Sequence, residues 1–185
     1  MEHRHRKKPP TIWLMTDERV DGALQLAAAA RLPRGRGGIV FRHYRTAPDE
    51  RRALFARFRA IARRRRLLLM LGGDAREAAG WGADGWHGGD HRRGSRPMLH
   101  SAPAHGAVEI RAAGRGKADL LFLSPLFPTR SHPGGRALGR VRFAMLARRA
   151  GVPVMALGGV EARHRRGLRA LGAAGWAAID GLMRG

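Results

Sequence analysis

The chain has 185 residues, no Cys, 36 Lys and Arg residues and 14 Asp and Glu residues, for a net charge of +22. This composition excludes disulfides, thiolate catalysis and Cys-bound metals, and a hydrophobic content of 44% is not that of a disordered chain. No apolar run approaches the roughly 18 residues of a membrane helix and no apolar signal core follows the basic N-terminus, so we expect a cytoplasmic protein that does not enter membranes.

Eight short apolar segments follow a basic N-terminal stretch. Residues 1–10 are predicted to form a disordered basic tail, and residues 11–185 one folded domain. The predicted strands cover residues 12–15, 38–41, 67–71, 85–86, 98–100, 120–123, 154–157 and 177–179. Most of these strands are continuously apolar, which is typical of parallel strands that are buried on both faces.

Helical patterns separate the strands. Between residues 49 and 65, Leu54, Phe58 and Ile61 recur at helical spacing, with Arg residues on the opposite face. Weaker patterns predict further helices over residues 22–31, 105–114, 141–150 and 161–171. The segment 88–97 is too rich in Gly, Arg and Pro for more than one helical turn, and little chain remains after the last strand.

This alternation predicts an α/β fold, a compact single-domain (β/α)8 TIM barrel. Such barrels usually take about 250 residues, so the short chain requires terse connections and a truncated last helix. The oligomeric state cannot be predicted from these patterns.

The positive charge has two interpretations. The runs Arg6–Lys8 and Arg63–Arg66 fit a polyanion partner, but the cations are spread over the whole chain and no nucleic-acid motif accompanies them. Arg, Ala and Gly share GC-rich codons, so composition bias explains the charge equally well. We therefore expect no nucleic-acid partner, and expect the field to attract small phosphorylated substrates.

In a barrel of this kind, the functional site lies where the strands end. The loop after residues 154–157 carries Gly158 and Gly159, whose backbone N–H groups can approach a phosphate closely. The long loop after residues 120–123 offers the further phosphate ligands Thr129, Arg130 and Ser131. These loops predict that the protein binds phosphorylated ligands.

Other polar residues at the predicted strand ends are candidates for the same site. Arg42 and Arg45 have the donor geometry for a diphosphate. Asp74 and Asp90 are the candidate ligands of Mg²⁺, which binds through one or two carboxylates and substrate phosphate oxygens. His87 is a candidate for ligand binding or proton transfer. For each of these residues a structural role, such as capping, packing or solvation, is an open alternative.

Several motifs then occur in the order of a known family. The chain resembles the thiamine-phosphate synthases, whose fold is shared with TenI-type aminothiazole tautomerases. The resemblance rests on WLMTD near the start, GADGWH around residues 82–87, SPLFPT at residues 124–129, VMALGGV at residues 154–160 and GAAGWA at residues 172–177.

The resemblance implies an Mg²⁺-dependent transferase of thiamine biosynthesis. Such an enzyme joins hydroxymethylpyrimidine diphosphate to a thiazole phosphate and releases diphosphate. By position, the resemblance implies that Arg42 contacts diphosphate or pyrimidine, that Ser101, Thr129 and Ser131 hold diphosphate, and that Gly158 and Gly159 hold the thiazole phosphate. Together with the candidates from the strand ends, we expect a catalytic set of Arg42, Ser101 and Ser131. We expect substrate or phosphate binding by Arg45, His87, Thr129, Arg130, Gly158, Gly159 and Gly181, and metal binding by Asp74 and Asp90.

Some positions depart from the family pattern. The strand-2 Gln and Lys are absent, Asp74 is displaced by one residue, and Asp180 stands where a Ser would face phosphate. The catalytic His of the tautomerases falls on Pro125. The leading interpretation is a synthase with relocated ligands. The alternatives are a thiazole tautomerase-like or other phosphate-ligand enzyme, and a non-catalytic barrel that has lost the metal site.

Overall fold

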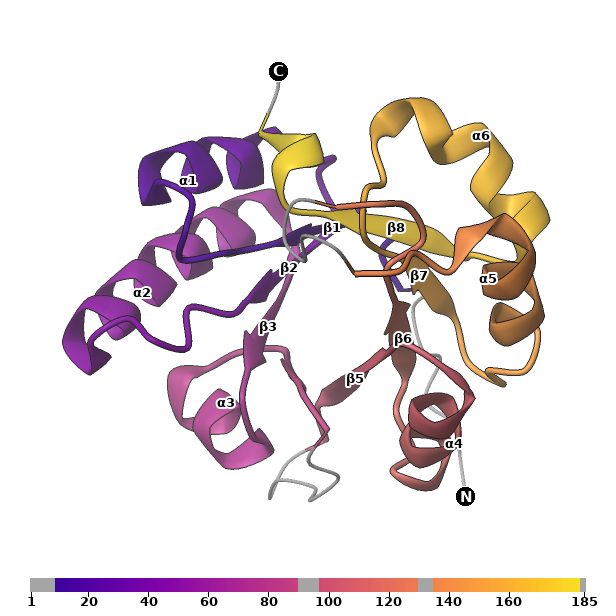
Figure 1. Ribbon diagram of the computed structural model, residues 1–185. Helices are drawn as coiled ribbons and strands as arrows, with labels where there is room; N and C mark the ends of the chain where they lie inside the picture. Colours follow the sequence, from indigo (N-terminus) through magenta and orange to yellow (C-terminus); the bar gives the residue numbers. More distant parts are fainter. Residues whose placement is uncertain (1–8, 90–96, 130–134, 184–185) are drawn as a thin grey trace.

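The protein is a closed eight-stranded parallel barrel (Figure 1). The structure, a computed structural model, describes residues 9–89, 97–129 and 135–183. Each strand is hydrogen-bonded to the next, and β8 (Gly175–Ala178) closes the barrel onto β1 (Ile12–Met15). The strands between them are β2 (Gly37–Phe41), β3 (Leu68–Gly72), β4 (Gly85–His87), β5 (Leu99–Ala104), β6 (Leu120–Leu123) and β7 (Val154–Ala156). All eight predicted strands are present, and the predicted fold class is confirmed.

Helices surround the barrel on its outer side. The helices α1 (Gly22–Arg31), α2 (Pro48–Arg65), α4 (Ala107–Arg115) and α5 (Gly139–Ala147) lie where the sequence predicts helices. The sequence patterns missed α3 (Ala75–Trp81), which Asp74 caps at its start and a left-handed Gly82 ends. This helix has seven residues, too few for a helical repeat to stand out.

The helical segments that follow β7 and β8 are short. The segment predicted as one helix over residues 161–171 contains two 3-10 turns, Ala162–His164 and Arg169–Leu171, on either side of the short α6 (Arg165–Leu168). The eighth helix is reduced to a 3-10 turn at Asp180–Leu182, as its predicted truncation requires. These reduced helices explain how 185 residues suffice for a barrel. The turn predicted in residues 88–97 lies mostly outside the described residues.

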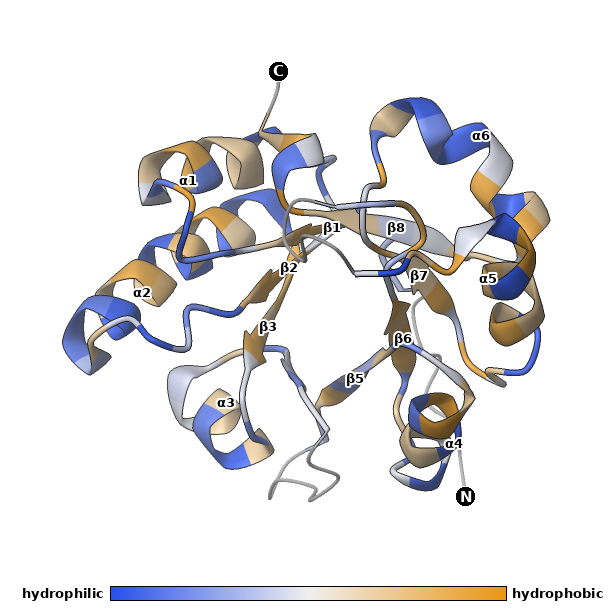
Figure 2. Ribbon diagram, viewed as in Figure 1, coloured by the Kyte–Doolittle hydropathy of each residue, from blue (hydrophilic) through white to orange (hydrophobic). Residues whose placement is uncertain are grey.

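Apolar side chains fill both the barrel and the space between strands and helices. Figure 2 shows that the barrel strands carry mainly hydrophobic residues. Trp13 is fully buried inside the barrel, edge-on to Phe122. Gly38 leaves room for this ring, because a Cβ at position 38 would lie 2.3 Å from it. The outward residues of β2 and β3 pack against α1 and α2, so these strands are buried on both faces, as their continuous apolar character predicts.

None of the helices in the described part of the chain combines the length and the apolar character that a membrane crossing requires.

Candidate functional site

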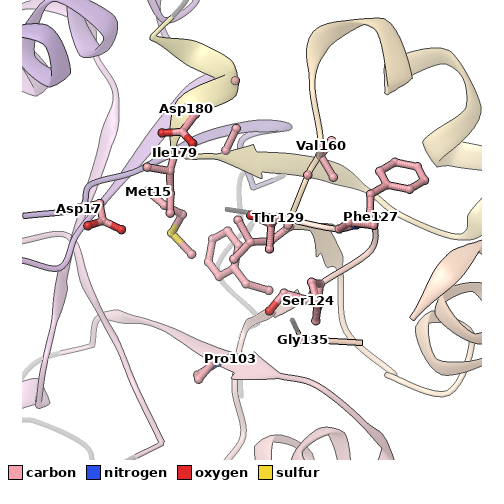
Figure 3. A pocket seen from close by; sticks show the side chains of 18 of the residues that line it. Met15, Asp17, Pro103, Ser124, Phe127, Thr129, Gly135, Val160, Ile179 and Asp180 are labelled. Atoms are coloured by element: carbon pink, nitrogen blue, oxygen red, sulfur yellow. The ribbon is translucent and has the colours of Figure 1, made fainter. Parts of the chain in front are cut away.

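A cavity of about 1260 Å³ opens at the C-terminal ends of the strands. Its walls come from the C-terminal ends of strands, such as His87 of β4, and from the segments that follow β1, β2, β5, β6, β7 and β8. Figure 3 shows Asp17 and Asp180 on one side of this cavity, Val160 and Phe127 on the other, and Thr129 between them. The parallel strands thus bring together residues far apart in the sequence, at the end of the barrel where such sites lie.

Cationic side chains outnumber carboxylates on the cavity wall. The lining arginines are Arg19, Arg42, Arg136, Arg142 and Arg163, and the lining carboxylates are Asp17, Glu161 and Asp180. Of these five arginines, the sequence predicts only Arg42 as a site residue. Arg136, Arg142 and Arg163 come from loops and helices whose path around the barrel no local pattern reveals. The excess of positive charge favours anionic ligands.

Arg42 is held by the end of β1. Its Nε donates a hydrogen bond to the Thr16 carbonyl oxygen (2.8 Å), and its backbone N–H donates to Thr16 Oγ1 (2.9 Å). Its Nη2 lies 3.5 Å from Asp17 Oδ2. Burial lowers the pKa of Arg42 from its ordinary value, while the charge of Asp17 opposes that shift. An arginine fixed in this way presents an oriented positive charge, as anion binding requires.

The same carboxylate binds a second arginine. Arg19 donates to Asp17 through Nε (2.8 Å) and Nη2 (2.6 Å), and through its backbone N–H (3.0 Å). These hydrogen bonds hold the pKa of Asp17 at about 2, against an ordinary value of 3.8. Asp17 therefore stays ionised between two guanidinium groups throughout the physiological pH range.

Gly158 and Gly159 line the opposite wall in left-handed conformations, with φ of 88° and 63°. A Cβ at Gly158 would lie 2.6 Å from Pro125 Cα, and one at Gly159 would lie 2.5 Å from the Pro128 carbonyl oxygen. The loop after β6 thus packs directly on these glycines. Within the described residues neither glycine N–H donates a hydrogen bond, so both stay available to a ligand.

The structure describes two of the four remaining candidates for phosphate binding. Thr129 and Gly181 line the cavity together with the two glycines. At Gly181 a Cβ would lie 2.7 Å from the Val160 carbonyl oxygen, so the chain passes closely there as well. Arg130 and Ser131 lie outside the described residues.

His87 lines the cavity, with Ser101 behind it. His87 is 6% exposed, and its Nδ1 lies 2.9 Å from the Oγ of Ser101, which is fully buried. Burial lowers the pKa of His87 from 6.5 to about 3, and the charge of Arg42 acts in the same direction. A neutral imidazole at physiological pH can exchange hydrogen bonds with a ligand but is poorly matched to proton transfer. Ser101 does not reach the cavity wall, so this placement supports its contact with His87 rather than direct contact with diphosphate.

The buried His87 predicts a pH-dependent stability. Between about pH 6.5 and about pH 3 the unfolded chain binds a proton that folded His87 does not bind, so the free energy of unfolding should fall as the pH is lowered through this window. His87→Gln should lose part of this dependence, and burial of His43 should maintain the rest. Urea unfolding at a series of pH values measures both. A slope that His87→Gln leaves unchanged would show that His87 titrates normally.

Two predicted ligands are not brought to the cavity. Asp74 accepts a hydrogen bond from the Glu77 backbone N–H (2.7 Å) as the N-cap of α3, and it is exposed. Arg45 is exposed as well, and its backbone N–H donates to Glu18 Oε2 (2.8 Å). Neither side chain lines the cavity. For Asp74, a local structural role as helix cap takes the place of the predicted ligand contact.

The expected Mg²⁺ site stays a prediction, since such a site takes only one or two carboxylates beside substrate phosphate oxygens. In residues 9–89, 97–129 and 135–183, no three His, Asp or Glu side chains form a group that could hold a metal ion. Of the two candidate ligands, Asp74 is engaged as a helix cap and Asp90 lies outside the described residues.

The placement of Asp74 gives a direct test. Asp74→Ala should lower the free energy of unfolding by about 1 kcal/mol, the usual effect of losing an N-cap. Urea denaturation measures this loss. The Mg²⁺ concentration that half-saturates any metal-dependent activity should not change. A shifted Mg²⁺ requirement at unchanged stability would instead assign Asp74 to the metal.

The fold and the cavity define a (β/α)8-barrel protein with a cationic site at the C-terminal ends of its strands. The sequence model of the family described as "Thiamine monophosphate synthase" matches residues 12–182. The chain belongs to this family, as its resemblance to the thiamine-phosphate synthases predicts.

Individual relatives agree with this assignment. The chain is 25% identical over 159 residues to "Putative thiamine-phosphate synthase 2" of Aquifex aeolicus, covering 82% of this chain and 86% of that protein. It is 26% identical over 143 residues to "Thiamine-phosphate synthase" of Geobacillus thermodenitrificans, covering 72% of this chain but only 65% of that protein. The structure is similar to the "Thiamine phosphate pyrophosphorylase" of Pyrococcus furiosus, with a TM-score of 0.76 at 22% identity, over 95% of this chain and 88% of that one. This structural likeness shows the shared fold.

Proposed function

We propose that this protein is a thiamine-phosphate synthase-like transferase that joins hydroxymethylpyrimidine diphosphate to thiazole phosphate and releases diphosphate. Family membership supports the class of reaction. The observation that carries the proposal at the level of the site is Arg42, which Thr16 and Asp17 hold at the wall of a cationic cavity.

The proposed reaction needs positive charge at the leaving group. As the bond to diphosphate breaks, negative charge grows on the departing oxygens, and an oriented guanidinium stabilises it without reorganising. Arg42 and the neighbouring Arg19 would supply that charge from one side of the cavity. The N–H groups of Gly158 and Gly159, which donate no hydrogen bond within the described residues, would hold the phosphate of the thiazole from the other side.

The test is the formation of thiamine phosphate from the two purified substrates, over a series of Mg²⁺ concentrations. Product should form at a rate that depends on both substrates, with one diphosphate released for each product molecule. Complementation of a strain that lacks the synthase provides the cellular counterpart. Absence of product at every Mg²⁺ concentration, together with failed complementation, would overturn the proposal.

A second candidate is a barrel that binds a phosphorylated ligand without turnover. Asp74 is engaged as the N-cap of α3 rather than as one of the two candidate metal ligands. This placement favours the barrel that binds without turnover. Asp180 adds a carboxylate to the same cavity that Gly158 and Gly159 line. Calorimetry distinguishes the two candidates: the binding barrel should release heat with thiazole phosphate but form no product when the second substrate is added.

A further inference from the structure

We propose that Gln25 and Asp17 are positioning residues of the site. In this proposal, Gln25 fixes the backbone of Asp17, and Asp17 holds the guanidinium groups of Arg19 and Arg42 side by side at one edge of the cavity. The inference rests on the proposed function only for the nature of the anion that this arginine pair receives.

Gln25 is a polar side chain that is fully buried on α1. Its Oε1 accepts a hydrogen bond from the Asp17 backbone N–H (2.8 Å). Its Nε2 donates to the carbonyl oxygens of Asp17 (3.0 Å) and Val20 (2.8 Å). A buried amide that makes three hydrogen bonds to one loop defines the path of that loop, because each lost bond would leave a buried polar group unsatisfied.

Asp17 links this fixed loop to the two arginines. Its Oδ1 accepts from the Arg19 backbone N–H and Nε, and its Oδ2 accepts from Arg19 Nη2 and lies 3.5 Å from Arg42 Nη2. Because Nη2 of Arg19 and Nη2 of Arg42 lie 2.6 Å and 3.5 Å from the same Asp17 oxygen, the two guanidinium groups are close enough to repel each other. The carboxylate between them offsets that repulsion.

Within the described residues, each arginine uses only part of its guanidinium group. The Nε and Nη2 groups of Arg19 are bound to Asp17, while Arg42 uses Nε for Thr16 and turns Nη2 toward Asp17. Among the described residues, Nη1 of neither arginine has a hydrogen-bond partner. Within the described residues, the network thus leaves the Nη1 groups of Arg19 and Arg42 for one ligand. The two guanidinium groups carry one positive charge more than the Asp17 carboxylate neutralises.

The positioning role and simple charge attraction predict opposite effects of Asp17→Asn on anion binding. Asp17→Asn keeps the shape of the side chain but removes a negative charge beside the anion site. If Asp17 only lowered the local potential, this change would strengthen anion binding. If Asp17 positions the arginines, the change should weaken binding of inorganic diphosphate by ~10- to 100-fold, because displaced catalytic groups lose effectiveness steeply.

Two measurements test the proposal on the full-length chain. In ¹⁵N NMR, the Nε–H group of Arg19, which donates to Asp17, should give a resolved, protected signal, and Asp17→Asn and Gln25→Met should each remove that protection. The Nε–H signal of Arg42, which donates to Thr16, should shift in both variants but stay protected. Calorimetric titration with inorganic diphosphate should show the weaker binding. Glu109→Gln is the matched control for charge, since Glu109 is exposed on α4 away from the cavity, and it should change neither measurement.

The outcomes separate the two proposals. Unchanged arginine signals in both variants, or tighter diphosphate binding by Asp17→Asn, would overturn the positioning role. A wild-type chain that binds no diphosphate would contradict the proposed function, while the NMR comparison would still decide the positioning role. If Gln25→Met does not fold, Asp17→Asn gives the same two readouts.

Discussion

Arg42→Ala should lower the catalytic rate of thiamine phosphate formation by ~10²- to 10³-fold, the loss typical of removing one preorganised donor from a developing anion. The reason is the oriented guanidinium: Thr16 and Asp17 hold it at the cavity wall before any ligand arrives. Steady-state kinetics with both substrates measures the effect. The free energy of unfolding should change little by comparison, because Arg42 is a partly exposed side chain of the rim.

Arg45→Ala is the matched comparison for this prediction. It removes the same charge three residues away, but the Arg45 side chain is exposed and does not line the cavity. The catalytic rate of the Arg45→Ala variant should stay close to that of the wild type. Arg42→Lys should remain impaired, since an ammonium group cannot reproduce the two directed contacts of the guanidinium. Equal losses in Arg42→Ala and Arg45→Ala would mean that only overall charge matters.

Gly158→Ala should lower both stability and activity. The position has φ of 88°, and the added Cβ would lie 2.6 Å from Pro125 Cα, a backbone atom that cannot move aside cheaply. Strain and overpacking together should cost about 3 kcal/mol of unfolding free energy. The displaced loop after β6 should also reduce activity, because that loop and Gly158 line the same cavity. Urea unfolding and kinetics at a temperature where the variant is folded separate the two effects.

Gly80→Ala is the control for a change from glycine to alanine. Gly80 lies within α3, where an added Cβ meets nothing within 4 Å. This substitution should stabilise the chain by about 0.5–1 kcal/mol through reduced freedom of the unfolded state. Comparable losses at positions 80 and 158 would show that the left-handed conformation and the contact with Pro125 do not matter.

Several parts of the site could be predicted from local sequence. The continuously apolar strands located the barrel, and the barrel in turn located Arg42, His87 and Thr129 at strand ends that converge on one cavity. Gly158 and Gly159 stood out because paired glycines after a buried strand mark a close approach of the backbone. The structure shows that close approach, in which the loop after β6 packs on both residues.

Other features of the site could not be predicted from local sequence patterns. Asp74 and Arg45 have the residue types of ligands, yet Asp74 caps α3, and Arg45 is exposed and does not line the cavity. Gln25 carried no signal at all, since a single Gln on a helix usually faces solvent. Its burial and its hydrogen bonds to the loop after β1 appear only once α1 is packed against the barrel.

The sequence by itself therefore determined the class of fold and the end of the barrel where the site lies, because burial of apolar strands is a property of each segment alone. Only the tertiary structure decided which charged groups meet there. Asp17 contacts Arg42 because β1 and β2 pair in register, and Arg142 reaches the cavity because α5 follows the loop after β6. Such contacts depend on the packing of whole elements, which no spacing along the chain encodes.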